Sequence, residues 1–351
     1  MTLSLSRIAP TPRTLELMAP LKFLLICGVV FIHCDWGGSA AAPMPAGAET
    51  IIARWDRYFL SLCVPGFFFL SGYLFFRHGT FSLKGYGLSL RRRVRTLLVP
   101  YLIWNTLGMF MMLAKTSPAL AHLFPQYQGW RPDLAHLVGG YWHLPGSYYP
   151  FDLTLWFLRD LILTVCLSWA IGLSLRKLGC LTLLPLCALL LLPCHIVGFP
   201  VEGLFFFGSG ATLAWCAGDL VSFLDRYGKW ACAAWALTVA IDLAYGLDRS
   251  TAVMQLAGIL ALIYGVSRSR ALTSHIPRGL LSLTFFIYAC HGLYCSVGRN
   301  IVLRLLPPRH TLTALADYLI IFLLLTATSA LAGLLTRRLC PRPFSLLTGG
   351  R

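Results

Sequence analysis

The sequence predicts an all-α integral membrane protein, a bundle of about ten transmembrane helices with both termini in the cytoplasm. Hydrophobic residues make up 57% of the 351 positions and charged residues only 12%, and the mean hydropathy is +0.71. These values lie far outside those of a soluble globular domain. Apolar runs long enough to cross about 30 Å of hydrocarbon also recur from end to end. Since a backbone in lipid must satisfy its own hydrogen bonds, such continuous runs favour helices.

Ten apolar runs account for the predicted spans. In chain order they cover residues 14–34, 52–76, 95–115, 152–174, 180–198, 201–223, 230–247, 251–267, 280–303 and 313–336. The connections between most of them are short, so residues 1–351 are expected to form a single integral membrane domain.

The basic residues alternate across these runs. Of the 29 lysines and arginines, 19 fall in the two tails and in every second connection, whereas the connections 35–51 and 195–201 contain none. Because cytoplasmic segments carry the excess of Lys and Arg, this alternation predicts cytoplasmic tails at about 1–13 and 337–351. It also accounts for the net charge of +16 without a nucleic-acid partner.

The longest polar connection, about 116–150, is predicted to lie outside the cytoplasm and is rich in Pro, Gly, His and aromatic residues. Loops of this length in compact proteins are commonly lids or binding surfaces. Aromatic residues at a membrane edge also anchor in the headgroup region. Both interpretations stay open at this point.

The twelve cysteines do not form a metal-binding pattern, because no CxxC pair or Cys/His cluster appears. Neither a metal site, nor a disulfide framework, nor a resident cofactor is therefore expected. Cys180, Cys187 and Cys194 repeat at seven residues and share one helix face. Small residues at such spacing favour packing between membrane helices.

Two ionisable residues, Lys22 and His33, lie eleven positions apart in the first apolar run. On an α-helix this interval is three full turns plus about 20°, so both lie on one face, about 16 Å apart along the axis. Ionisable groups in a membrane helix are costly unless they face a polar interior or a cavity. The alternatives are a lysine that snorkels to the interface and a histidine bonded to a neighbouring helix.

Four further motifs follow in order along the chain. They are VPGFFFLSGYL at 64–74, RRRVRTLLVPYLIWN at 91–105, LWFLRDL at 155–161 and FFIYACHG at 285–292. Together with the Lys22–His33 interval, this series resembles the membrane-bound acyltransferase family 3, which includes O-acetyltransferases of bacterial surface polysaccharides.

The resemblance implies about ten transmembrane helices and transfer of an acyl group, usually acetyl, from acyl-CoA to a sugar hydroxyl. The acceptor would be a surface polysaccharide or a lipid-linked glycan, and the location the bacterial inner membrane. It implies that His33 is the catalytic histidine and that the cation at position 22 belongs to the same site. Many relatives carry Arg there; Lys22 keeps the charge but lacks the bidentate fork.

Chemistry supports these roles, because transfer from a thioester to an alcohol needs a base that removes the hydroxyl proton. His33 suits that role, while Lys22 meets CoA at the cytoplasmic end. Arg92 and Arg95 share a helix face at i, i+3. They either bind the phosphates of CoA or are basic only because cytoplasmic segments carry an excess of Lys and Arg. Other candidates for substrate or donor contact are Trp156, Arg159, Asp160 and His291. The first three are equally suited to holding helices together. For His291, a packing or substrate-positioning role is as open as a catalytic one.

Two other functions remain possible from the sequence. A transporter or flippase of an acylated or lipid-linked substrate also needs polar groups along a membrane cavity, though inverted repeats would be typical of it. A non-catalytic scaffold would keep the bundle and leave His33 dispensable.

Overall fold

The computed structural model describes residues 10–37, 43–77, 81–123, 130–144, 147–191, 199–247 and 251–350, and all regular structure within them is helical. Five stretches of this described part are long and apolar enough to cross a membrane, and a sixth counts if one bent pair of helices forms a single span. The all-α class is confirmed, and the apolar helices fit a multi-pass membrane protein. The count of ten spans and the orientation stay predictions.

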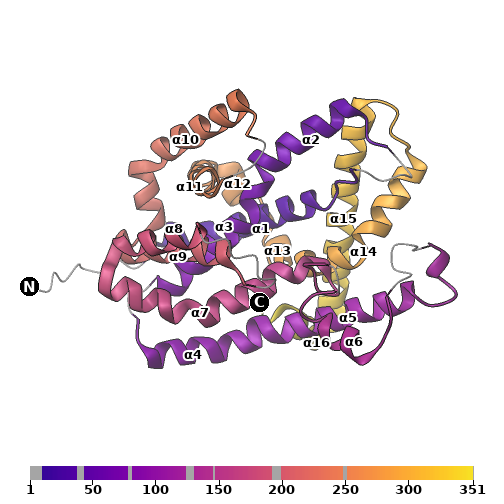
Figure 1. Cartoon of the computed structure of the whole chain (residues 1–351), viewed down its shortest axis with the longest axis horizontal. Helices are drawn as coiled ribbons and strands as arrows, with labels where there is room; N and C mark the ends of the chain where they lie inside the picture. The colour runs from indigo at the N-terminus through magenta and orange to yellow at the C-terminus, as the bar shows by residue number, and fades with distance from the viewer. Residues whose placement is uncertain are drawn as a thin grey trace, which may run out of the picture.

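The helices are arranged as Figure 1 shows. They are α1 (Pro12–Ile32), α2 (Ala46–Tyr58), α3 (Cys63–Phe76), α4 (Leu83–Arg93), α5 (Val99–Lys115), α6 (Leu134–Gly139), α7 (Trp156–Leu178), α8 (Leu183–Leu190), α9 (Val201–Cys216), α10 (Leu220–Tyr245), α11 (Ala252–Arg268), α12 (Arg270–Ser274), α13 (Arg278–Leu281), α14 (Thr284–Leu305), α15 (Thr311–Leu339) and α16 (Pro341–Thr348).

Helix α1 occupies the middle of the bundle and packs against α3, α11, α14 and α15 (Figure 1). It begins at a capped end, because the Thr11 side chain accepts a hydrogen bond from the backbone N–H of Thr14. Pro12 follows at the first helical position, where its missing N–H is not needed. This central position explains why both faces of α1 are apolar and why its polar groups must point at cavities or neighbours.

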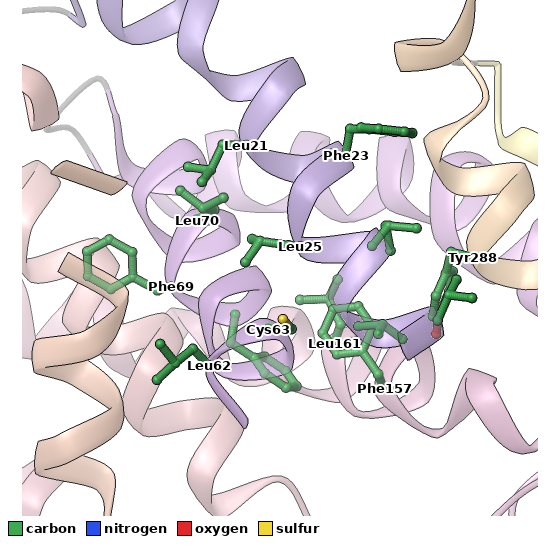
Figure 2. Packing of buried hydrophobic residues seen from close by; sticks show 14 of the residues in the cluster. Leu21, Phe23, Leu25, Leu62, Cys63, Phe69, Leu70, Phe157, Leu161 and Tyr288 are labelled. Carbon is green, nitrogen blue, oxygen red and sulfur yellow. The ribbon is translucent and has the colours of Figure 1, made fainter. Parts of the chain in front are cut away.

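Close packing holds α1 to its neighbours. Figure 2 shows Leu21 and Leu25 of α1 beside Leu70 and Cys63 of α3, all of them buried. At Gly28 a Cβ atom would lie 2.2 Å from the sulfur of Cys63, so only glycine permits this approach. The register of α1 against α3 is therefore set by a small residue on one helix and a cysteine on the other.

The predicted spans coincide with helices, but several bounds differ. Predicted span 52–76 is part of a longer stretch, Ala46–Phe76, and predicted span 95–115 is the end of Leu83–Lys115. Predicted span 180–198 is helical to Leu190, where α8 ends, and its residues 192–198 lie outside the described residues. Residues 1–9 and 351 of the predicted tails also lie outside them.

The predicted span 201–223 contains a sharp bend and extends into a second helix. Helix α9 ends at Cys216, and the chain bends by 112° before α10 begins. Gly218 takes a φ of +75°, which the absence of a Cβ allows. Asp219 then caps α10 by accepting a hydrogen bond from the backbone N–H of Ser222 at 2.9 Å. A turn glycine followed by a capping carboxylate thus ends one helix and begins the next.

Helices α3 and α9 approach each other more closely than side chains would allow. A Cβ atom at Gly72 would lie 1.8 Å from the carbonyl oxygen of Phe207, and one at Gly210 would lie 1.9 Å from that of Phe69. Small residues at such crossings let membrane helices pack backbone to backbone. Gly72 belongs to the VPGFFFLSGYL motif, so this part of the motif has a packing role.

The cysteine prediction needs one correction. Cys180 forms a disulfide with Cys216, which joins the start of the α8 segment to the end of α9. Cys187 is exposed on α8, and Cys194 lies outside the described residues. The seven-residue spacing indicated that the three cysteines share a helix face. It could not show that Cys216, from another helix, would lie next to Cys180.

Candidate active site

Two cavities lie along α1, one beside His33 at its C-terminal end and one beside Lys22 at its middle. The His33 cavity has a volume of about 660 Å³ and lies among α5, α14 and the segment 130–153. The Lys22 cavity has a volume of about 400 Å³ and lies among α1, α3, α7 and the start of α14. The two polar residues therefore do not share one cavity; each lines its own.

His33 follows the last residue of α1 and serves as its C-terminal cap, with its backbone N–H 3.1 Å from the carbonyl oxygen of Val30. Its half-buried side chain lines the cavity together with Lys115, Ser296 and Gly292. A helix end places the imidazole where it reaches the cavity without leaving the protein interior. The side chain is thus available to a substrate in that cavity.

The structure brings His291 to His33, although 258 positions separate them in the sequence. The ring centroids are 5.4 Å apart, with the ring planes at 44°. His291 lies on α14 and is fully buried. Its Nδ1 lies 3.1 Å from the carbonyl oxygen of Ile287. Two of the predicted site residues therefore form a pair, of which His33 lines the cavity and His291 lies buried behind it.

The Lys22 cavity holds a second cation, Arg93, rather than the predicted Arg92 and Arg95. Arg92 and Arg95 are exposed, and neither lines a described cavity. Helix α4 ends at Arg93 and is followed by a π-helical turn, Val94–Leu98. A π-helical turn has a different number of residues per turn from an α-helix. The π-helical turn begins between Arg92 and Arg95, where the sequence predicted a regular α-helix.

Arg159 and Asp160 form a buried ion pair at the start of α7, with 2.8 Å between Nε and Oδ1. Arg159 also donates hydrogen bonds to the carbonyl oxygens of Trp142 and Tyr148, at 2.6 and 3.0 Å. The Tyr148 hydroxyl donates to the other oxygen of Asp160. These contacts hold Trp142 and Tyr148 against α7, and we call them the loop clamp.

The clamp accounts for three predicted residues that line neither cavity. Arg159 and Asp160 contact the loop, and the Trp156 ring packs against Tyr148 at 5.7 Å between centroids. The loop itself supplies Trp130 and Tyr149, among others, to the wall of the His33 cavity. Of the two interpretations of the polar connection, contact with a cavity is the one that the described part of the loop supports; residues 124–129 and 145–146 lie outside it.

Comparison with known proteins then decides the family. Residues 21–336 match the family model of the acyltransferase domain, type 3. The chain belongs to the acyltransferase 3 family. This acyltransferase is also similar to the succinoglycan biosynthesis protein ExoH of Rhizobium meliloti (strain 1021), with 28% identity over 357 residues, 94% of this chain and 91% of that protein. No solved structure matches the chain.

The resemblance found in the motifs is thereby confirmed, and the protein is a membrane acyltransferase that transfers groups other than amino-acyl groups to oxygen. The individual roles of its site residues rest on their geometry alone.

Two basic residues near His33 were missed by the sequence reasoning. Lys115, at the end of α5, lines the His33 cavity of the acyltransferase. Arg299 of α14 donates a hydrogen bond to the carbonyl oxygen of Asp35, two residues after His33, and so holds the chain that leaves α1. Arg299 lies inside the apolar run 280–303, where any charge indicates a functional or structural site. That signal was present in the sequence and could have identified it.

The loop clamp leads to a prediction for Tyr148→Phe. The change removes the proton that Tyr148 donates to Asp160 and leaves a buried carboxylate oxygen without that partner, at a cost of about 1–3 kcal/mol. We expect the loop to loosen and the KM for the acceptor to rise roughly tenfold, since about 1.4 kcal/mol corresponds to a factor of ten. Steady-state kinetics with varied acceptor measure this. Tyr245→Phe, at an exposed tyrosine of α10, is the control; equal kinetics of the two variants would contradict the prediction.

Proposed function

We propose that this acyltransferase moves an acyl group, in the simplest case acetyl, from acyl-CoA to a hydroxyl of a sugar in a surface polysaccharide or lipid-linked glycan. His33 acts as the general base. The observation that carries the proposal is the pair of separate cavities along α1, with Lys22 lining one and His33 lining the other.

The Lys22 cavity suits the donor. Lys22 and Arg93 place two cationic side chains at a mainly apolar space, which residues such as Phe157 and Leu161 line. Lysine and arginine side chains form strong, charge-assisted hydrogen bonds with phosphate groups, such as those of CoA. The apolar part of the wall suits the pantetheine arm of CoA. Donor binding here accords with the predicted cytoplasmic N-terminus, because basic residues mark this end of the bundle.

A row of residues on α14 connects the two cavities. Tyr288 lines the Lys22 cavity. One turn later His291 lies 6.5 Å from it between ring centroids and 5.4 Å from His33. In the proposal, a long arm carries the thioester from the Lys22 cavity past these residues to His33. The interval of about 16 Å along α1 is the distance to be bridged.

The His33 cavity suits a sugar acceptor. Trp130, Tyr149 and Phe151 present aromatic rings to it, and His136 and Ser147 present polar groups. Binding sites typically combine an apolar wall with a few placed polar groups. The similar ExoH protein is named for the biosynthesis of succinoglycan, a polysaccharide, which also supports a glycan acceptor.

The reaction follows from these positions. His33 removes the proton of the acceptor hydroxyl as its oxygen attacks the thioester carbon. The tetrahedral intermediate places negative charge on the former carbonyl oxygen, and Lys115, which lines the same cavity, would stabilise it. When the carbon–sulfur bond breaks, the proton on His33 passes to the CoA thiolate. With both termini in the cytoplasm, the donor enters from inside and the acceptor is acylated outside.

Sealed vesicles containing the protein test the proposal. Acetyl-CoA labelled in the acetyl group is supplied on the side of the N-terminus, and a polysaccharide or lipid-linked oligosaccharide on the other. We expect label in ester linkage on the glycan and free CoA on the donor side. Glycan that crosses the vesicle membrane without acquiring label would instead favour a transporter and overturn the proposal.

Lys22 provides a prediction on the donor side. Lys22→Met removes the charge and should raise the KM for acyl-CoA by about 10–100-fold, because a hydrogen bond to a charged group contributes about 1.5–3 kcal/mol. Lys22→Arg should stay within a few fold of wild type, since it keeps the charge. The control is Lys84→Met, at an exposed lysine of α4. A wild-type KM in Lys22→Met would remove Lys22 from the donor site.

A further inference from the structure

We propose that His291 is a positioning residue, whose Nε2 accepts a hydrogen bond from His33 and so fixes the tautomer in which His33 acts as the base. The inference rests on the proposed function, in which His33 removes the acceptor proton. It gives His291 a role that differs from the packing, substrate-positioning and catalytic roles considered from the sequence.

The proton on His291 can be located from its surroundings. Its Nδ1 lies 3.1 Å from the carbonyl oxygen of Ile287. A carbonyl oxygen can only accept, so Nδ1 carries the proton. In a neutral imidazole the second nitrogen, Nε2, then holds a lone pair. The backbone of α14 itself thus sets the tautomer of His291.

That lone pair lacks a partner among the described residues. His291 is 0% exposed, and its Nε2 makes no hydrogen bond. Buried polar atoms in proteins are nearly always paired, so a buried unpaired acceptor indicates a missing donor. The neighbouring Tyr288 does not supply this donor, because its hydroxyl donates to the carbonyl oxygen of Thr154 at 2.8 Å.

His33 is in place to supply the donor. Its ring centroid lies 5.4 Å from that of His291. At that separation two imidazole rings can bring one nitrogen of each to hydrogen-bond distance, about 3 Å. A small rotation of the His33 ring, which is only half-buried and borders the cavity, makes the contact. Nε2 of His291 would then be satisfied without movement of α14.

This hydrogen bond would determine which nitrogen of His33 acts as the base. With its N–H held by His291, His33 keeps its other nitrogen unprotonated and facing the cavity, where the acceptor hydroxyl binds. After proton transfer, the imidazolium still donates to His291, which favours the charged form. This is the role that an orienting residue has in a catalytic triad. The proton itself moves from the hydroxyl to His33 and then to the CoA thiolate, while His291 keeps its own proton throughout.

Two amide substitutions separate this role from a structural one. The amide group of Asn overlays Nδ1 of His, so His291→Asn keeps the bond to Ile287 and removes the acceptor near His33. The amide group of Gln overlays Nε2, so His291→Gln does the reverse. We expect kcat in His291→Asn to fall by about 100-fold, with the KM for acyl-CoA unchanged within about twofold. His291→Gln should recover at least about tenfold of that loss.

The experiment also includes wild type, His33→Ala and the thermal unfolding midpoint of each protein in detergent. Wild-type kcat in His291→Asn, or a lower kcat in His291→Gln than in His291→Asn, overturns the inference and leaves the proposed function intact. An active His33→Ala protein removes the proposed base, and the inference with it. A fall in kcat that follows the unfolding midpoint in both amide variants assigns His291 to stability alone and also overturns it.

Discussion

Replacing His33 by alanine is expected to lower kcat for acyl transfer by about 10²–10⁴-fold, the usual contribution of a general base. The acceptor hydroxyl is a poor nucleophile while it keeps its proton. Besides His33, the titratable or hydroxyl groups in the described wall of the cavity are those of Lys115, His136, Ser147, Tyr149 and Ser296. A lysine that stabilises negative charge cannot also take the proton. The KM for acyl-CoA should change little, because Lys22 and Arg93 line a separate cavity.

The measurement is release of CoA and ester formation by purified protein in lipid nanodiscs. His275→Ala, at an exposed histidine between α12 and α13, is the matched control and should behave as wild type. Thermal unfolding of each variant shows that the bundle is intact. An alanine variant with wild-type kcat would show that another group removes the proton, and the assignment of His33 would have to be abandoned.

Replacing Gly72 by alanine is expected to prevent α3 and α9 from packing. The new Cβ would lie 1.8 Å from the carbonyl oxygen of Phe207 and 2.6 Å from its carbonyl carbon, both backbone atoms. Backbone cannot rotate away as a side chain can, so the helices must separate along their contact. Overpacking of this kind costs about 1–3 kcal/mol or more, and α3 also lines the Lys22 cavity through Phe67, Ser71 and Leu74.

The expected result is little or no folded protein after extraction, measured as the monodisperse fraction in size-exclusion chromatography. Gly265→Ala is the control, because nothing lies within 4 Å of a Cβ at that position of α11. Alanine is favoured over glycine inside a helix, so this variant should be as stable as wild type or slightly more so. Equal recovery of the two variants would contradict the close approach of α3 and α9.

Much of the site could be predicted because polar groups are conspicuous in an apolar sequence. Ionisable side chains in apolar runs cost free energy unless they have a partner or face a cavity. Five predicted site residues lie inside or beside such runs: Lys22, His33, Arg159, Asp160 and His291. Arg299 also lies inside such a run and could have been predicted in the same way. Composition and run length alone predicted the all-α membrane class, since lipid leaves few ways to satisfy a backbone.

The sequence alone could not show which arginine of the cluster at residues 91–95 lines the donor cavity. Arg91, Arg92, Arg93 and Arg95 are alike in sequence, and a regular α-helix was the only basis for choosing among them. In the structure Arg93 lines the Lys22 cavity, and a π-helical turn follows it at Val94–Leu98. Which arginine lines a cavity depends on the position of α4 against distant helices, and the local pattern of charge does not specify that position.

The sequence by itself determined the class of protein, the family and the helix that carries Lys22 and His33, because each of these follows from local composition, spacing or motif. Tertiary structure alone decided that the two residues line separate cavities, that His291 faces His33, and that Arg159 and Asp160 hold the loop beside the cavity. These are contacts between segments far apart in the chain. Their geometry depends on close packing at positions such as Gly28 and Gly72, where the absence of a single side chain sets the distance between helices.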